Sequence, residues 1–479
     1  MKVTLFLAAL VSAALLTGLA AAQLHSAPTD PDTVSGPDTI PAEITGEVIL
    51  EGALVLEGDV MVNGGAVLTI LAGSVVRPRP GSGMTVQGQL RIQGEKGRPV
   101  VIVPSEGVQW KGITFLSGAE GTVTWVEIGG AGTALSLIAS RLSIDDAFVS
   151  GSKTAIHLVR EASAQITDCQ LKDNQIGVAV DMKSVGRVSG CLFEGNEVGL
   201  GIASGGVPEI SGNRFVGNSL GIQVHQRYPG KIEGNLFREN KAGIRLYQNG
   251  PDTIVEKNRF VDNQDASVLA LSYTSPTIRN NFMSGGKYGI FVNQFSSPRI
   301  LDNRIEKMEE AVHLNKKNAS EFVGNVVADS KVGLFCDFSS YPRIRDNLFA
   351  GNDLHIKLGK FQSSNWEGRA GSKRLVMQAA TRAGSRNPRL AEGPEEFPEA
   401  VDATGNWWDK KTLREMKNKG EAVEISTLYD GHDLDKVTYE GFGDESYTLD
   451  KVLYWPALEK EPVTAGLKGW KGNSGELGF

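Results

Sequence analysis

The chain has 479 residues, of which 41% are apolar and 22% are charged, and its formal net charge is -7. This balance is ordinary for a soluble protein, and the acidic charge gives no indication of a nucleic-acid partner. The three cysteines form neither a C-x-x-C-H haem site nor a paired C-x-x-C metal knuckle. The sequence therefore predicts no cofactor and no metal site.

Residues 1–22 have the pattern of a secretory signal. Lys2 precedes an apolar run that ends at Leu16, and Ala20, Ala21 and Ala22 supply the small residues of a cleavage site. We predict cleavage after Ala22 and a secreted or periplasmic protein. The apolar run is short for a transmembrane helix, so no membrane span is expected in the mature chain.

Residues 23–46 are rich in Pro, Asp and Thr and are predicted to be a disordered linker. From Glu47 the sequence changes to alternating β-branched residues separated by glycine turns, as in 67–70 and 86–92. This alternation of β-branched residues between glycine turns indicates short strands. We expect them to form an irregular cap on the repetitive region that follows, because a stack of repeats must cover its open apolar end.

A phrase of 22 or 23 residues recurs between Ile144 and Leu358. Its fourth position is mostly asparagine, with apolar residues three before and two after it, and a small residue eight after it. The fourth-position column is Ala147, Cys169, Cys191, Asn213, Asn235, Asn258, Asn281, Asn303, Asn325 and Asn347. Repeats of this length indicate a stacked solenoid. Asparagine suits the turn because it tolerates left-handed backbone and its amide bonds to neighbouring backbone groups. The column therefore predicts a ladder of stacked amides, and a second ladder is predicted five residues on, at Asn174, Asn196, Asn218, Asn240 and Asn263.

Each repeat is too short to include an ordinary helix and alternates with period two, so we predict rungs of three short strands. Parallel coils of this kind are expected to be right-handed. The fold class is therefore all-β, a single right-handed parallel β-helix over 47–360. An inserted loop follows at 361–401, then the last rung and C-terminal cap at 402–458 and a tail at 459–479. Asn406-Trp407-Trp408 repeats the phrase after the insertion, and Lys410 to Lys419 is predicted to be a short capping helix ending at Gly420.

Three sequence features together resemble right-handed parallel β-helix proteins of the pectate-lyase-like superfamily. They are the I-x-x-N-x-F phrase, the L-T-I-x-x-G-S-V-V opening at 68–76 and the Asn406-Trp407-Trp408 element. That superfamily includes polysaccharide lyases and hydrolases, phage tailspikes, adhesins and periplasmic copper-maturation proteins. The resemblance implies the fold but leaves the chemistry open.

Two pairs of acidic residues share a phase in adjacent rungs and are candidates for catalysis. Glu233 and Glu256 form one pair, and Glu239 and Asp262 form the other. Adjacent rungs place each pair about 5 Å apart, as in retaining glycosidases. Arg279 continues the first column, so a solvated network of surface charges is the favoured interpretation.

Several repeats contain a predicted strand that reads Gly-Ile-x-Val, as at 221–224. A polar-aromatic strip lies within and just after these strands and is the candidate binding surface. Aromatic faces beside amides and arginine suit sugar rings, although stacked rings also stabilise neighbouring rungs. The strip consists of His225, Tyr228, Arg245, Tyr247, Tyr273, Phe291, Asn293, Phe295, His313, Phe335, Asp337 and Phe338.

Cys169 and Cys191 replace asparagine in adjacent rungs, where either a disulfide or two buried thiols would fit. The thiols are favoured because the rung spacing is wide for a relaxed disulfide. As a whole, the sequence favours an exported, non-catalytic protein that binds an extended polysaccharide or a cell-surface partner. A polysaccharide lyase or glycoside hydrolase is the alternative, and a periplasmic metallocofactor-maturation accessory protein is the second alternative.

Overall fold

The computed structural model describes residues 38–105, 107–369, 399–434, 436–438 and 446–462. The predicted signal sequence, residues 370–398 of the predicted insertion and the tail from 463 onward lie outside these residues. None of the described helices is long and apolar enough to cross a membrane.

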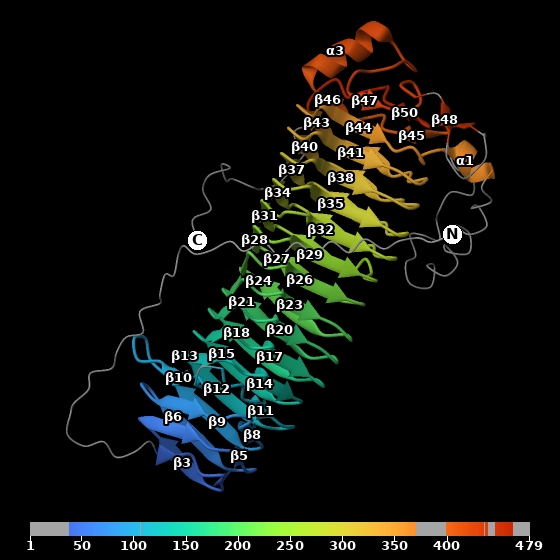
Figure 1. Cartoon of the computed structure of the whole chain (residues 1–479). Coiled ribbons are helices and arrows are strands. Elements are labelled where there is room, and N and C mark those ends of the chain that lie inside the picture. Colours follow the sequence, from blue (N-terminus) through green and yellow to red (C-terminus); the bar gives the residue numbers. More distant parts are fainter. Residues whose placement is uncertain (1–37, 106, 370–398, 435, 439–445, 463–479) are drawn as a thin grey trace, which may run out of the picture. The chain divides into compact units, whose positions relative to one another are not determined.

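Three long parallel sheets, here called A, B and C, contain nearly all of the strands (Figure 1). Sheet A has 16 strands: β1 Asp38–Thr39, β4 Ala53–Leu56, β7 Val75–Pro78, β10 Val100–Ile102, β13 Val126–Gly129, β16 Phe148–Ser150, β19 Gln170–Lys172, β22 Leu192–Glu194, β25 Arg214–Val216, β28 Leu236–Arg238, β31 Arg259–Val261, β34 Phe282–Ser284, β37 Arg304–Glu306, β40 Val326–Ala328, β43 Leu348–Ala350 and β46 Trp407–Trp408. Sheet B also has 16 strands: β2 Glu43–Ile44, β5 Asp59–Val62, β8 Gly83–Val86, β11 Gly112–Phe115, β14 Thr133–Ile138, β17 Thr154–Val159, β20 Ile176–Val180, β23 Val198–Ile202, β26 Leu220–His225, β29 Ala242–Tyr247, β32 Ala266–Leu271, β35 Tyr288–Asn293, β38 Glu310–Leu314, β41 Val332–Cys336, β44 Leu354–Leu358 and β47 Leu428–Tyr429. Sheet C has 14 strands: β3 Glu47–Leu50, β6 Val67–Leu71, β9 Gln89–Gln93, β12 Glu120–Thr124, β15 Arg141–Asp145, β18 Ser163–Thr167, β21 Val185–Ser189, β24 Val207–Ser211, β27 Lys231–Glu233, β30 Ile254–Glu256, β33 Thr277–Arg279, β36 Arg299–Leu301, β39 Glu321–Val323 and β42 Arg343–Arg345.

Each rung contributes one strand to sheet C, one to sheet A and one to sheet B. Each strand therefore pairs in parallel with the strand three places earlier in the chain. The predicted parallel β-helix of three-stranded rungs is therefore confirmed. Two further strand pairs lie near the C-terminus. They are β45 Ala400–Asp402 with β50 Lys451–Leu453, and β48 Lys436–Thr438 with β49 Ser446–Thr448.

The core is built from apolar columns that run along the inside of the coil. The phenylalanine column shows the packing most clearly, because Phe193, Phe215, Phe237 and Phe260 are all 0% exposed. Their ring centroids are 4.5, 4.9 and 4.7 Å apart, and the rings are nearly parallel. Each rung thus buries the same side chain against its neighbour, which is how a one-dimensional stack generates a continuous core.

Buried asparagines form two ladders along the turns, one between sheets C and A and the other between sheets A and B. In the first ladder, Asn258 Oδ1 accepts both the backbone N–H and the side-chain N–H of Asn235, at 2.9 and 3.0 Å. Asn258 Nδ2 then donates to Ile232 O and to Asn281 Oδ1. In the second ladder, Asn174, Asn196, Asn218, Asn240 and Asn263 repeat this pattern. The predicted amide ladders are confirmed.

The reason given for asparagine in these turns needs correction. Positive φ belongs to the residue before each ladder asparagine, as at Lys257 (56°), Asp302 (53°) and Gly234 (67°). The asparagine itself is conserved in the repeat for its amide, which satisfies buried backbone groups of the adjacent rung.

The β-helix begins earlier than the sequence predicted. β1 and β2 pair with β4 and β5, and Ile40 and Ile44 are 2% and 1% exposed. Residues 38–46 are therefore part of the stack, and the predicted linker at 23–46 was too long. Burial of these two side chains is enough to hold the segment in place, because β4 and β5 provide strand edges with which it can pair.

The C-terminal predictions at 406–420 are confirmed. β46 pairs with β43, and Asn347 Nδ2 donates to Asn406 Oδ1 at 2.9 Å across the insertion. Helix α3, Lys410–Lys419, is capped by Asp409, whose carboxylate accepts the N–H of Thr412, and is followed by Gly420 with φ of 89°. The insertion is not a loop throughout, because it contains the helix α1, Ser364–Arg369, and strand β45.

Cys169 and Cys191 are free thiols and are 0% exposed, as favoured by the sequence. The thiols occupy the place of the ladder amide, and Cys191 Sγ donates to Ile166 O at 3.6 Å. A hydrogen bond with the Cys191 thiol, together with burial, raises the pKa of Cys169 well above its usual value.

The ladder predicts a large effect for the loss of one amide. Asn258→Ala should lower the free energy of unfolding by about 3 kcal/mol or more, because it leaves several buried groups of two rungs without partners. Urea unfolding followed by circular dichroism measures the change. Cys191→Asn is the matched variant, since its Nδ2 can reach Ile166 O and extend the ladder. We expect it to be no less stable than the natural chain, and a loss equal to that of Asn258→Ala would contradict the ladder's role.

Candidate functional site

The outer face of sheet B contains a column of stacked rings at consecutive rungs. Phe291, His313 and Phe335 are register partners on β35, β38 and β41, with ring centroids 4.7 and 4.6 Å apart. Tyr288 meets the His313 ring edge-on at 5.3 Å. Strand register therefore brings these members of the polar-aromatic strip together.

A second line of rings lies at the end of sheet B and in the turn that leads to sheet C. His225 stacks on Tyr247 at 4.8 Å, and Tyr273 stacks on Phe295 at 5.4 Å. All four side chains are half-buried, so each keeps part of its surface in solvent. Tyr273 and Phe295 have φ of 60° and 57°, a conformation that bulky residues rarely adopt.

Helix α1 closes one end of this line. The Phe361 ring stacks on Phe338 at 4.3 Å, and Trp366 of α1 packs edge-on against Phe338 at 6.4 Å. Glu367 is 0% exposed and accepts hydrogen bonds from Lys317 at 2.7 Å and Ser339 at 2.6 Å. Burial lowers the pKa of Lys317, while its bond to Glu367 opposes that change. The start of the insertion is thus fixed against the strip.

Two predicted members of the strip do not offer their side chains to a ligand. Tyr228 is 1% exposed, and its hydroxyl lies 2.8 Å from Pro208 O and 2.9 Å from Lys231 O. The turn through Gln226 and Arg227, both with positive φ, sends this side chain into the core. Asp337 is 8% exposed and accepts the N–H groups of Phe338 and Phe361 at 2.9 and 2.8 Å. Burial raises the pKa of Asp337.

The remaining polar members, Arg245 and Asn293, are half-buried on the outer side of sheet B. Arg245 pairs in register with Leu269 of the next rung, and Leu269 pairs in register with Phe291 of the rung after that. Asn293 Oδ1 accepts the N–H of Gln294 at 2.8 Å and so shapes the turn.

The first carboxylate pair is engaged by basic side chains. Glu233 and Glu256 are register partners, as predicted. However, Glu256 accepts from Arg279 at 2.6 Å and from Lys231 at 3.0 Å, and Glu233 accepts from Lys257 at 2.6 Å. Burial opposes ionisation of Glu256, but the bonds to Lys231 and Arg279 outweigh it and lower its pKa. An acid held ionised in this way cannot serve as the proton donor that glycoside hydrolysis needs.

The second pair occupies turn positions. Glu239 and Asp262 are exposed and have φ of 56° and 54°, each directly before an asparagine of the second ladder. Their place in the repeat is therefore explained by the turn that precedes Asn240 and Asn263.

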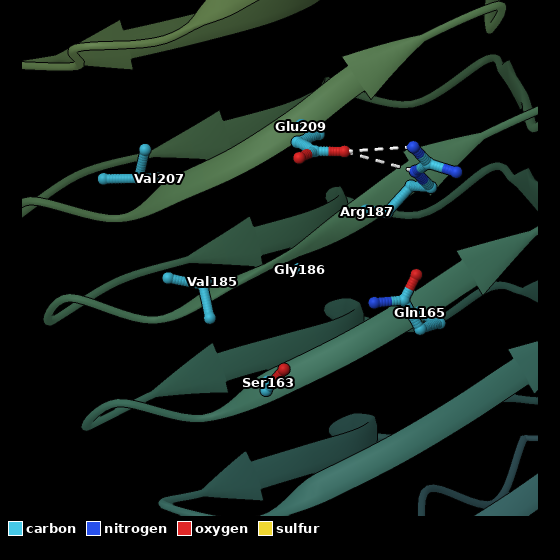
Figure 2. A pocket seen from close by; sticks show the side chains of 7 residues that line it. All are labelled: Ser163, Gln165, Val185, Gly186, Arg187, Val207 and Glu209. Atoms are coloured by element: carbon cyan, nitrogen blue, oxygen red, sulfur yellow. Dashed lines mark hydrogen bonds and ion pairs between the residues drawn. The ribbon is translucent and has the colours of Figure 1, made fainter.

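Sheet C has a shallow open groove of about 500 Å³ that the sequence analysis missed. Figure 2 shows Arg187 directed toward Glu209 across adjacent strands, and the two side chains form an ion pair at 3.2 Å. Gly186 packs closely against the adjacent strand, because a Cβ there would lie 2.2 Å from Ala164 O. The lining residues are Ser163, Gln165, Val185, Gly186, Arg187, Val207 and Glu209. The alternation of outward residues in this sheet was the only available signal.

Two family models match parts of the chain. The first, described as "Right handed beta helix region", matches residues 133–283. The chain is a right-handed parallel β-helix repeat protein. The second, described as "Periplasmic copper-binding protein (NosD)", matches residues 246–380, which include most of the polar-aromatic strip.

The solved structures that the chain resembles are distant in sequence. A periplasmic alginate epimerase, AlgG, is 13% identical over 63% of this chain and 77% of its own, with a TM-score of 0.45. The Agl-KA catalytic domain is 12% identical over 61% and 63%, with a TM-score of 0.39. A PL6 alginate lyase solved with a trisaccharide is 12% identical over 65% and 80%, with a TM-score of 0.31. A comparison with curated proteins gave no match.

The ion pairs of Glu256 predict a structural role with a defined pH dependence. Glu256→Ala should lower the free energy of unfolding by roughly 1–2 kcal/mol, since Lys231 and Arg279 can turn to solvent once the carboxylate is gone. The pKa of Glu256 is lower in the folded state than in the unfolded state, where it is about 4.3. Its contribution is therefore complete above that pH and is lost as the pH falls through the folded value.

Thermal unfolding of the natural protein and of the Glu256→Ala variant between pH 7 and pH 3 tests this expectation. The melting temperatures of the two proteins should converge at the acidic end of this range. Glu239→Gln, at an exposed turn, is the control and should change stability by no more than about 0.5 kcal/mol. A Glu256→Gln variant of normal stability that abolishes release of reducing ends from a polysaccharide would instead favour the enzyme.

Proposed function

We propose that this chain is an exported, periplasmic, non-catalytic protein that binds an extended polysaccharide along the polar-aromatic strip. The exposed parts of the rings on sheet B and its following turn provide flat apolar surfaces at the spacing of the rungs. Sugar rings present matching apolar faces and can stack on such surfaces while their hydroxyl groups reach polar neighbours.

The observation that carries this proposal is the backbone at Tyr273 and Phe295. Both residues have positive φ, which costs an L-residue roughly 1–2 kcal/mol and which glycine or asparagine accepts far more easily. The equivalent turn position in other rungs also has positive φ but carries the polar residues Lys183, Arg227 and Lys317, so aromatic rings at this position are particular to Tyr273 and Phe295. Two stacked aromatic rings at such positions support a role in recognition, because backbone strain of this kind is concentrated at functional sites.

A non-catalytic role is supported by the state of the candidate acids. Glu233 and Glu256 are committed to ion pairs, and Glu239 and Asp262 lie in turns of the second ladder. Periplasmic localisation is supported by the predicted signal sequence and by the name of the family model that matches residues 246–380.

Replacing the two aromatic residues of the turn, Tyr273 and Phe295, distinguishes a role in binding from a role in stability. Tyr273→Asn combined with Phe295→Asn should leave the melting temperature unchanged or raise it, because asparagine tolerates positive φ. The same double variant should lose at least about tenfold in affinity for a polysaccharide that the natural chain binds, since each stacked ring contributes roughly 1 kcal/mol. A glycan array identifies such a polymer, and titration calorimetry and thermal unfolding give the two quantities.

Lys316→Asn makes the same exchange at a turn position with φ of 56° but no ring, and should leave binding unchanged. A fall in melting temperature of the double variant with full retention of binding would show that the rings serve only to hold the rungs together.

A second candidate is a periplasmic accessory role in metallocofactor maturation, favoured by the family model at 246–380. The described residues fit a copper centre poorly. Within them, no three or more His, Cys, Asp or Glu side chains converge. Cys336, the one cysteine in the matched stretch, faces the core and is 0% exposed.

We expect the purified chain, loaded with one equivalent of Cu(I) or Cu(II), to lose the metal on dialysis against a weak chelator. Atomic absorption of the dialysed protein is the measurement. Retention of one copper per chain that Cys336→Ala or His313→Phe abolishes would transfer the assignment to the second candidate.

A further inference from the structure

Two polar atoms inside the polar-aromatic strip have no hydrogen-bond partner. His313 Nε2 and Asn315 Oδ1 are buried, and neither finds a partner among the described residues. The two residues are neighbours on the outward side of the same rung, because β38 runs through His313 and Asn315 follows that strand directly, with its N–H donating to Val292 O. Both atoms therefore belong to one small area of the strip.

The His313 ring is held in a fixed orientation. Glu310 Oε2 lies 2.6 Å from Nδ1, which favours the tautomer with the proton on Nδ1, and in that tautomer Nε2 is an acceptor. Phe291 and Phe335 stack on the two faces of the imidazole, and Tyr288 meets its edge. A side chain that is 9% exposed and fixed on three sides is set up for recognition.

Asn315 differs from its equivalents in the neighbouring rungs. One rung earlier, Asn293 Oδ1 accepts the N–H of Gln294, and one rung later Asp337 Oδ1 accepts the N–H of Phe338. These oxygens hold the start of the turn, whereas the oxygen of Asn315 has no such bond. The turn therefore does not account for the position of the Asn315 amide.

We propose that His313 Nε2 and Asn315 Oδ1 form a specificity-determining subsite that accepts two hydroxyl protons from a neutral sugar ring stacked on the strip. A buried acceptor without a donor costs roughly 1–3 kcal/mol, and hydroxyl donors of a ligand would remove that cost. A uronate carboxylate at the same place would add only acceptors, so the subsite selects against it. This inference rests on the proposed polysaccharide-binding function.

Access to the two atoms requires a small rearrangement, because both are covered in the ligand-free protein. Phe335 and Tyr288 are half-buried on an outer face, and side chains in such places change rotamer rapidly. Binding then requires these neighbouring side chains to move far enough for the hydroxyl groups of the sugar to reach the two atoms.

Two substitutions test the subsite. His313→Phe keeps an aromatic ring in the column but removes Nε2, and Asn315→Ala removes the second acceptor. Each should lower affinity for a neutral polymer about tenfold, the effect of losing one good hydrogen bond. Gln170→Ala is the control, and it should leave affinity unchanged because Gln170 is an exposed residue of β19 on sheet A, outside the strip. The probes are mixed-linkage glucan, galactomannan and arabinan, with polygalacturonate as the anionic comparison, in affinity electrophoresis and titration calorimetry.

Stability provides a second readout. His313→Phe should melt at the same temperature as the natural chain or higher, because it removes an unpartnered buried acceptor. If His313 served only to stabilise the fold, the same substitution would lower the melting temperature. Retained binding of neutral polymers by His313→Phe and Asn315→Ala, with loss in the Tyr273→Asn and Phe295→Asn double variant, would overturn the subsite and leave the proposed function intact. Preference of the natural chain for polygalacturonate would also overturn the subsite. Binding to none of the four polymers or the arrayed glycans would overturn the proposed function itself.

Discussion

The hydrogen bonds that join each rung to the next are the constraint on which the rest of this structure depends. A ladder asparagine satisfies the backbone N–H of the preceding rung, the amide of that rung and a carbonyl one rung back. All of these groups are buried, so a rung of the wrong length would leave several of them unpaired at once. This explains why the turn from sheet C to sheet A keeps a constant form from Asn213 to Asn406.

The third turn, from sheet B to sheet C, is free of that constraint, and variation collects there. It takes up the additional residue between Asn235 and Asn258, because His225 pairs with Tyr247 but Ile232 with Val255. The additional residue between Asn258 and Asn281 lies in the turn from sheet A to sheet B, because Phe237 pairs with Phe260 but Ala242 with Ala266. A smaller ladder of hydroxyl groups accompanies the turn from sheet B to sheet C, in which Thr274 N donates to Ser296 Oγ and Asn318 N to Ser340 Oγ. Aromatic side chains could therefore accumulate beside this turn without disturbing the coil.

Strand register brings like charges together as readily as it brings rings together. Glu233 and Glu256 meet because they share a phase, but Lys231, Lys257 and Arg279 are carried to the same place by the same register. The result is a set of ion pairs on the outer surface of sheet C.

The sequence by itself determined the coil, the rung length, both amide ladders, the return of the repeat at Asn406 and the helix at 410–419. Each follows from local periodicity, which one chain displays in full. It also identified the rings of the strip, since His225, Tyr247, Phe291 and Phe335 share phases that register then aligned. Only the tertiary structure decided that Tyr228 turns inward and that residues 38–46 join the stack. It alone revealed the unpartnered atoms of His313 and Asn315. Those features depend on turn geometry and on side chains from three successive rungs, and neither is encoded in the period of a single repeat.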